Sequence, residues 1–544
     1  MNLDNSSISI VDLPDEMLLS IFNKLSNFDV LYWLVGVNKK LDNIARDRKF
    51  TQSIDLTSIS SSEKDDPKTN AILDRFCLYI LPRIDNNVKC LIIDGYFLER
   101  ILHGNKFFNL QRITLINLDM NMASHILNEN YPFVINFKQK LSELIIRIDC
   151  EDPSVSMLNL LIDIYHRTFA LFSNLKYLDL DVNNNYFFSK SLLSGLSSTA
   201  CISSSITHLC IKLHNIDDCL RLLDGRLNQL HTYIVKLEFI HDPELLRHYP
   251  SEITHNASLL LNNTKNVEKL KCFSLCACVQ TTELDSLVIP LVHRLSHLEK
   301  LTLSLRVSER YSYIDGTYLE NSLLRQMPYL QTFFFDIATE YVYIDGQVRP
   351  YFNDIRHTFI QRGYNVDGYI DSMNSINKIW NRYHVYSLPF HMEYIHPISH
   401  GFPGGMFINV ANLRIRDRSN SFEHSFFAKI SRSFPLLRRL SIQIKIEKKE
   451  KSEEVSSIIE FSRLVELKYV SAHIDYVEQF LSDMKTRLPS LIKLIIRYEH
   501  LATITENFRR NATRINCAKL KSIEFYDETP MVHSKDFYLY FPLL

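Results

Sequence analysis

The amino-acid sequence predicts a mixed α/β protein, in which a small helical domain precedes stacked units of one strand and one helix. Three observations support this prediction. Apolar residues recur at helical spacing between residues 13 and 45. A six-residue motif, apolar-x-x-apolar-x-apolar, then occurs fourteen times from Val88 onward. Segments with helical periodicity separate many of its copies. We therefore expect a curved parallel sheet on the inside and helices on the outside.

The composition indicates a neutral globular protein. The chain has 544 residues and a formal net charge of −1 at pH 7, so no overall charge attracts nucleic acid or an anionic membrane. No apolar run is long enough to span a bilayer, and the first residues lack the pattern of a signal peptide. Ten scattered cysteines are typical of reduced thiols. We expect a cytoplasmic or nuclear protein that binds neither nucleic acid nor membrane.

Residues 13 to 45 have the pattern of two or three short helices. Pro14 is tolerated at the start of a helix, and Asp15 and Glu16 follow in the first turn, where the helix dipole favours anions. Ser26 is a common cap for a second helix. The two apolar stripes consist of Met17, Leu18, Ile21, Phe22 and Leu25, and of Leu34, Val37, Leu41 and Ile44. A unit of about 40 residues is too small to be stable alone, so it is expected to dock on something.

This segment resembles an F-box, whose pattern begins Leu-Pro-x-Glu and continues through an apolar helix and a Leu-rich helix. The matching residues are Leu13, Pro14, Glu16, Leu18, Ile21, Phe22, Leu25, Asp29, Leu31, Leu34 and Val37. Asn38 and Leu41 stand where the family has Cys and Trp or Phe. The resemblance implies binding to the Skp-type adaptor of a cullin–RING ubiquitin ligase through Leu13, Pro14, Leu18, Ile21, Phe22, Leu25, Leu31, Leu34 and Val37. A chance amphipathic helix pair is the alternative.

The repeated motif has the spacing of a short strand with one buried side. Its fourth and sixth positions are two residues apart, so both point into the core when the segment is extended. Copies begin at Val88, Leu110, Leu141, Leu175, Ile206, Ile234, Val267, Leu298, Leu330, Val410, Leu437, Leu464, Leu491 and Leu520. The array resembles the irregular leucine-rich-repeat solenoids that often follow an F-box. A helical-repeat protein is the alternative, but the helical stretches between copies, such as 156–174 and 475–490, favour strands.

Five segments are expected along the chain. They are an F-box-like domain (1–50), a linker and lead-in helix (51–87), a first part of the repeats (88–335), a degenerate repeat with an insertion loop (336–409), and a second part of the repeats (410–544). Histidine, proline and glycine are frequent in residues 391–407. We expect this stretch to be a long loop that protrudes from the solenoid.

No metal, cofactor or catalytic activity is expected. Two groups of residues, His391, His396 and His400 and also Cys272, Cys276 and Cys278, have no standard zinc-ligand spacing. Cys272 is instead expected to be a core residue of its repeat. The sequence contains no Gly-rich phosphate loop, no Gly-x-Ser-x-Gly and no His-Glu-x-x-His.

The third and fifth positions of the motif alternate with the buried positions and are expected to line the concave face. Many of them are cationic, which favours an acidic or phosphorylated protein partner. Alternatively, Lys and Arg simply fill exposed strand positions, where their long stems cover apolar surface. The candidate contacts are Tyr177, His208, Lys236, Lys269, Lys271, Phe273, Lys300, Phe334, Arg414, Arg439, Lys468 and Lys493.

The sequence thus predicts a substrate-recognition subunit of an SCF-type E3 ubiquitin ligase, in which the F-box binds the adaptor and the repeats bind a protein substrate. The first alternative is a leucine-rich-repeat scaffold whose N-terminal helices cap the solenoid and have no ligase role. It predicts burial of Leu18 and Phe22 against the first repeat. The second is an enzyme with an unrecognised site in residues 336–409, which requires a deep pocket with converging polar groups.

Overall fold

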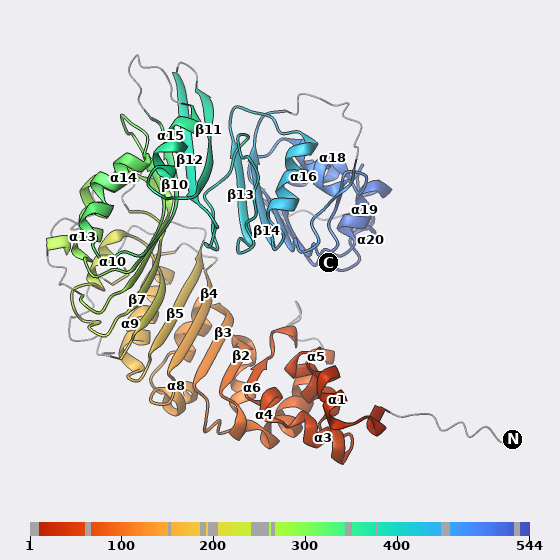
Figure 1. Ribbon diagram of the computed structural model, residues 1–544. Coiled ribbons are helices and arrows are strands. Elements are labelled where there is room, and N and C mark those ends of the chain that lie inside the picture. The colour runs from red at the N-terminus through yellow and green to blue at the C-terminus, as the bar shows by residue number, and fades with distance from the viewer. Residues whose placement is uncertain are drawn as a thin grey trace. The chain divides into compact units, whose positions relative to one another are not determined.

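The structure is a computed structural model (Figure 1). It describes residues 10–59, 67–150, 154–184, 192–193, 205–240, 260–262, 267–342, 351–375, 378–447, 457–526 and 534–544. The chain forms two compact units, which we call unit 1 (Met1–Glu238 and Leu245–Phe273) and unit 2 (Phe239–Glu244 and Ser274–Leu544). Both are mixed α/β with mostly parallel strands, which confirms the predicted class. Among the described residues, no helix has the length and apolar character needed to cross a membrane.

Unit 1 begins with four short helices, α1 (Asp15–Phe22), α2 (Asn27–Leu34), α3 (Lys39–Ala45) and α4 (Arg48–Thr51). Ser26 caps α2, because its side chain accepts a hydrogen bond from the Asp29 amide. Gly36 has a φ of 81°, a conformation that glycine adopts easily, and it separates α2 from α3. Asn38, a departure from the F-box pattern, caps α3 by accepting from the Leu41 amide at 2.9 Å.

The strands of unit 1 pair in parallel and in chain order (Figure 1). They are β1 (Ser53–Asp55), β2 (Cys90–Asp94), β3 (Arg112–Asp119), β4 (Glu143–Cys150), β5 (Tyr177–Asn184), β6 (His208–Leu213) and β7 (Thr232–Leu237). The third motif positions pair with one another, as Arg112 does with Glu143 and Glu143 with Tyr177. The amides of Ser142 and Glu143 both donate to the carbonyl of Gln111, and the same pattern recurs at the next strands.

Helices connect these strands. They are α5 (Pro67–Arg75), α6 (Leu98–Leu102), α7 (Met120–Ile126), α8 (Pro132–Phe137), α9 (Val155–Leu171) and α10 (Ile216–Arg221). Polar residues cap several of them, as Asp119 caps α7 and Asn215 caps α10. The segment expected as a linker contains β1 and α5, and residues 60–66 of that segment lie outside the described part of the chain.

Two copies of the motif begin at residues other than those predicted. The amides of His231 and Thr232 donate to the Thr207 carbonyl, so the copy assigned to Ile234 begins at Leu230. The amides of Lys271 and Cys272 donate to the His231 carbonyl, so the copy assigned to Val267 begins three residues later. Cys272 is therefore half-buried at a third position, and the expectation that it is a core residue was wrong.

Unit 2 contains a first sheet that has both parallel and antiparallel strands. In spatial order they are β8 (Cys272–Thr281), most of which lies in unit 2, then β9 (Lys300–Ser308), β10 (Thr332–Glu340), β12 (Lys378–Ser387) and β11 (Val366–Ser375). Strand β10 is parallel to β9, whereas β12 is antiparallel to both β10 and β11. The accompanying helices are α13 (Ile289–Arg294), α14 (Gly316–Ser322) and α15 (Phe352–Ile360).

A second sheet of unit 2 consists of β13 (Asn412–Asp417), β14 (Arg439–Ile444), β16 (Glu466–Tyr469), β18 (Lys493–Ile496) and β19 (Ser522–Phe525), all parallel. Strands β15 (Ile459–Glu460) and β17 (Thr486–Arg487) form a small pair of their own. The helices are α16 (His424–Ser433), α17 (Ile474–Leu481), α18 (Tyr498–Ile504), α19 (Asn511–Cys517) and α20 (Lys535–Tyr540). The stretch 475–490 was expected to be helical, but α17 ends at Leu481, and Met484 beyond it is exposed.

Residues 394–400, which we call the strap, do not protrude as expected. Ile398 pairs with Ile415, with its amide bonded to the Arg414 carbonyl and its carbonyl bonded to the Arg416 amide, both at 2.9 Å. The side chains of Ile395 and His396 are fully buried. The strap packs because it pairs with the edge of β13, where unpaired backbone groups would otherwise remain.

Candidate functional site

The N-terminal helices of unit 1 leave an apolar face exposed, which we call the helix face. It consists of Met17, Ile21, Leu25, Trp33 and Val37, whose side chains are between 42% and 66% exposed. Met17 and Ile21 are one helical turn apart on α1, and Leu25 follows that helix. Trp33 lies on α2 and Val37 follows it. Single exposed apolar residues are ordinary, but five within one short segment are uncommon, and exposed apolar patches are typical of interaction sites.

The residues predicted to hold an adaptor fall into two groups. Pro14, Ile21, Leu25 and Val37 are exposed, and Leu13 and Leu34 are half-buried. Leu18, Phe22 and Leu31 are buried in unit 1, so direct adaptor contact through these three side chains is a prediction that the structure corrects. The reason is the helical repeat: Leu18 and Phe22 are one turn apart and face inward, and the residues just before them face outward.

The inner side of these helices packs on the start of the strands of unit 1. Asn27 donates its side-chain amide to the Ser53 carbonyl of β1 at 2.8 Å. The rings of Phe28 and Phe76 lie 5.4 Å apart. The capping alternative requires burial of Leu18 and Phe22 against the first repeat; both side chains are buried, but the contacts with β1 come from α2 and α4. Trp33 was not among the predicted contacts. A tryptophan outside the apolar stripe of a helix is nevertheless a sequence feature typical of protein interfaces.

Several of the predicted cationic contacts are partnered within the chain. Lys236 lies 3.4 Å from Asp181, Arg439 lies 3.8 Å from Glu466, and Lys493 lies 2.5 Å from Glu524. Lys300 lies over the ring of Phe334. Carboxylates on nearby strands therefore offset part of the positive charge that the sequence places on this side of the sheets.

The remaining predicted contacts are dispersed. Tyr177 is half-buried and its ring stacks on that of exposed His208, with 6.4 Å between the centroids. Phe273 is buried beside Tyr233, so its expected exposure was wrong. Lys269 and Lys271 lie before β8 rather than on it because of the change in register. Arg414 is exposed on β13, and Lys468 is half-buried on β16.

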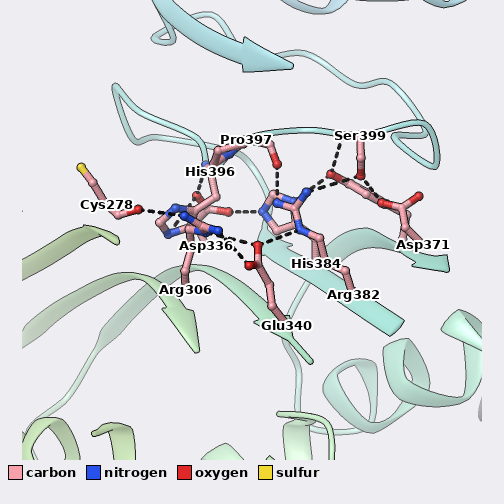
Figure 2. Close-up of polar contacts among 11 residues, drawn as sticks. Cys278, Arg306, Asp336, Glu340, Asp371, Arg382, His384, His396, Pro397 and Ser399 are labelled. Atoms are coloured by element: carbon pink, nitrogen blue, oxygen red, sulfur yellow. Dashed lines mark hydrogen bonds and ion pairs between the residues drawn. The ribbon is translucent and has the colours of Figure 1, made fainter. Parts of the chain in front are cut away.

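A buried polar cluster in unit 2, which we call the aspartate cluster, joins β9, β10, β12 and the strap (Figure 2). Asp336 lies at its centre and is fully buried. One carboxylate oxygen lies 2.6 Å from Nε2 of His384, and the other accepts from the backbone amide of His396 at 2.8 Å. Nε2 of His396 lies 3.2 Å from the Ser304 hydroxyl. These contacts link residues far apart in sequence and hold the strap on the strands.

A second carboxylate beside the aspartate cluster is shared by two arginines (Figure 2). Arg306 donates to both oxygens of Glu340, at 3.2 and 2.7 Å, and Nε of Arg382 lies 3.3 Å from one of them. Arg382 also donates to the Pro397 carbonyl of the strap. All three charged side chains are buried. Buried charges persist only when paired and hydrogen-bonded, and these are.

The pKa values in this region follow from burial and pairing. Burial raises the pKa of Asp336, but the neighbouring His396 and His384 outweigh it and hold this pKa below its usual value of 3.8. Burial likewise raises the pKa of Glu340, but Arg306 and Arg382 reverse the effect and lower it to about 2. Burial lowers the pKa of His396 to about 3.

Ser304, His396 and Asp336 are the residue types of a hydrolase triad, but their geometry is different. His396 approaches both Ser304 and Asp336 with the same nitrogen, Nε2, at 3.2 and 3.9 Å. A triad uses the two ring nitrogens for the two partners. The Nδ1 atom of His396 has no hydrogen-bond partner in the described part of the chain. Because all three side chains are buried, the cluster is suited to holding structure rather than to reaching a substrate.

No group of three or more His, Cys, Asp or Glu side chains among the described residues is arranged to hold a metal ion. No protein-family model matches this chain, and no curated protein matches it.

Proposed function

We propose that this chain is a substrate-recognition subunit of an SCF-type E3 ubiquitin ligase. The observation that carries the proposal is the helix face, because its five exposed apolar side chains lie in the segment that resembles an F-box. A segment of this kind binds the Skp-type adaptor, which would cover the apolar surface.

The capping alternative and the adaptor proposal concern opposite sides of the same helices. Leu18, Phe22 and Leu31 face the core of unit 1, and the helix face points away from it. One set of short helices can therefore cap the strands and also bind an adaptor. On this proposal the adaptor contacts are the predicted residues that are not buried, together with two exposed residues that were not predicted, Met17 and Trp33. The predicted residues that remain are Leu13, Pro14, Ile21, Leu25, Leu34 and Val37.

We further propose that the strands belong to leucine-rich repeats that hold a protein substrate. Support comes from the parallel pairing of third motif positions and from the recurrent donation of two amides to one carbonyl. Such a receptor catalyses no covalent step itself. It raises the local concentration of substrate lysines near the ubiquitin-conjugating enzyme.

Binding of the purified Skp-type adaptor to the full-length protein tests the proposal. The double variant Ile21→Glu/Trp33→Glu places two charges on the helix face. We expect at least about a tenfold loss of affinity, since buried anchors of this kind each contribute about 2 kcal/mol or more. The matched control is Phe108→Glu/Ile135→Glu, which alters two exposed apolar residues elsewhere in unit 1.

The control variant should bind the adaptor as the unaltered protein does. Absence of binding by the unaltered, folded protein would leave the helices with a capping role only. Equal losses in both double variants would show that the helix face is not the adaptor site.

A further inference from the structure

Unit 2 has an open groove of about 790 Å³ beside the strands β13, β14, β16 and β18. Part of its lining is a row formed by the residue that precedes each motif copy. This row consists of Asn409, Leu436, Arg463 and Ser490. The second motif position contributes another row, Ala411, Arg438 and Val465.

The strand register aligns these two rows. Asn412 pairs with Arg439, Arg439 with Glu466, and Glu466 with Lys493, with no shift between strands. Residues at equal distances before these positions therefore lie side by side. With about 4.8 Å between strands, four copies present a track about 14 Å long, which is the length of four or five extended residues.

The groove is lined by cationic side chains and by apolar side chains. Arg438 and Arg463 are exposed, and neither forms an ion pair with any residue that the structure describes. Ile408 and Leu436 present apolar surface, with exposed fractions of 52% and 38%. Glu393 is the single carboxylate of the lining. The groove thus has an excess of positive charge on a chain whose net charge is −1.

We propose that this groove binds an extended segment of a partner protein in which acidic and apolar residues alternate. Its carboxylates accept hydrogen bonds from Arg438 and Arg463, and its apolar side chains lie on Ile408 and Leu436. The guanidinium group suits a carboxylate in both charge and geometry. The apolar side chains of the lining and the near-neutral chain favour a peptide over a nucleic acid. Binding of such a segment does not depend on the proposed function. Only the identification of the partner as a ligase substrate rests on it.

The test uses fluorescence anisotropy with the full-length protein and a short fluorescein-labelled peptide in which leucine alternates with glutamate. Counterpart peptides carry glutamine, lysine or phosphoserine in place of glutamate. We expect the glutamate peptide to bind at least about tenfold more tightly than the glutamine peptide, which corresponds to about 1.4 kcal/mol. The lysine peptide should not bind. Equal binding of the glutamate and glutamine peptides, or binding of the phosphoserine peptide alone, overturns the proposal.

Variants locate the site. Arg438→Glu/Arg463→Glu should lower the affinity for the glutamate peptide about tenfold or more, and Arg438→Lys/Arg463→Lys should retain part of it. The matched control, Arg497→Glu/Arg514→Glu, makes the same change in net charge at two exposed arginines outside the groove. An equal loss in the control would overturn the proposal.

A third comparison separates this inference from the adaptor proposal. The variant Ile21→Glu/Trp33→Glu should bind the peptide normally whether or not the chain binds an adaptor. Loss of adaptor binding with intact peptide binding supports both proposals. Peptide binding without any adaptor binding by the unaltered protein supports the groove alone.

Discussion

At the scale of single residues, the carboxylates of Asp336 and Glu340 remain charged in the core of unit 2 because each is paired on more than one side. Asp336 contacts two histidines, and Glu340 contacts two arginines. Removal of one partner would leave the buried charge only partly compensated, which is a costly change in a protein interior.

We expect the protein to lose stability in acid through His396. Burial lowers the pKa of His396 from 6.5 to about 3, so the folded protein binds no proton there at pH 5, whereas the unfolded chain does. Stability from this group is complete above about pH 6.5 and is lost as the pH falls toward 3. We expect a loss of about 2 kcal/mol between pH 7 and pH 5 from this residue. Urea unfolding at the two pH values measures it.

The variant His396→Gln should reduce this pH dependence, because it removes the titrating ring. The matched control is His357→Gln, which alters an exposed histidine of α15 and should retain the full dependence. Below about pH 4 the lowered pKa of Asp336 adds a loss in the same direction, since protonation weakens its pairing with the histidines. An unchanged slope in His396→Gln would contradict the assignment.

The side chain of Asn516 bonds to backbone groups of α17, of β17 and of Leu488 just after β17. Its oxygen accepts from the Leu488 amide at 3.0 Å. Its nitrogen lies within 3.2 Å of three carbonyl oxygens, those of Phe480, Leu481 and Thr486. Asn516→Ala should cost about 2–4 kcal/mol of unfolding free energy, since these groups lose their partner without gaining water.

Urea unfolding compared with Asn511→Ala, an exposed asparagine of the same helix, measures that cost. The control should change stability by less than about 1 kcal/mol. Equal effects of the two substitutions would show that the Asn516 contacts contribute little.

At the scale of elements, the strap completes the edge of β13, and β11 and β12 form an antiparallel pair beside β10. An exposed edge strand is a site for unwanted pairing with other chains. In unit 2 the chain covers the β13 edge with its own segment and secures that segment through Asp336 and Arg382.

Close approach of two strands gives the prediction at this scale. A Cβ atom at Gly368 of β11 would lie 2.0 Å from the carbonyl oxygen of His384 on β12. Gly368→Ala must therefore move the backbone, and we expect a loss of about 2 kcal/mol or more. At Gly104 nothing lies within 4 Å of the added atom, so Gly104→Ala should cost only the strain of its positive φ, about 1 kcal/mol. Thermal unfolding of the two variants compares them; a smaller loss for Gly368→Ala would contradict the expectation.

At the scale of the whole molecule, the N-terminal helices belong to the fold of unit 1 and are not an independent appendage. Contacts such as Asn27 with Ser53 and Phe28 with Phe76 join them to it. Deletion of residues 1–50 should therefore lower the melting temperature by several degrees, because it uncovers β1 and Phe76. The substitutions Ile21→Glu/Trp33→Glu should leave it nearly unchanged. Differential scanning calorimetry distinguishes the two, and equal stability of the truncated chain would contradict the capping contacts.

Much of the α/β organisation was predictable because the motif recurs with one spacing. At Leu437, Leu464 and Leu491 the predicted third positions pair as expected. Two copies were displaced because LHTYIVKLEF and VEKLKCFSL each contain the motif in two registers. Local pattern gives no preference between two such registers. The backbone hydrogen bonds to Thr207 and His231 decide between them.

The candidate site was predictable only in part, for the same physical reason. Local pattern is enough to show that the segment of α1 has apolar residues on adjacent sides, that strands and helices alternate, and that residues 391–407 interrupt the motif. Long-range packing leaves Leu18 covered and Ile21 exposed, and it places His396 against Asp336, sixty residues away. Periodicity specifies which side of an element is apolar. What covers that side depends on contacts between residues distant in the chain, which no local pattern records.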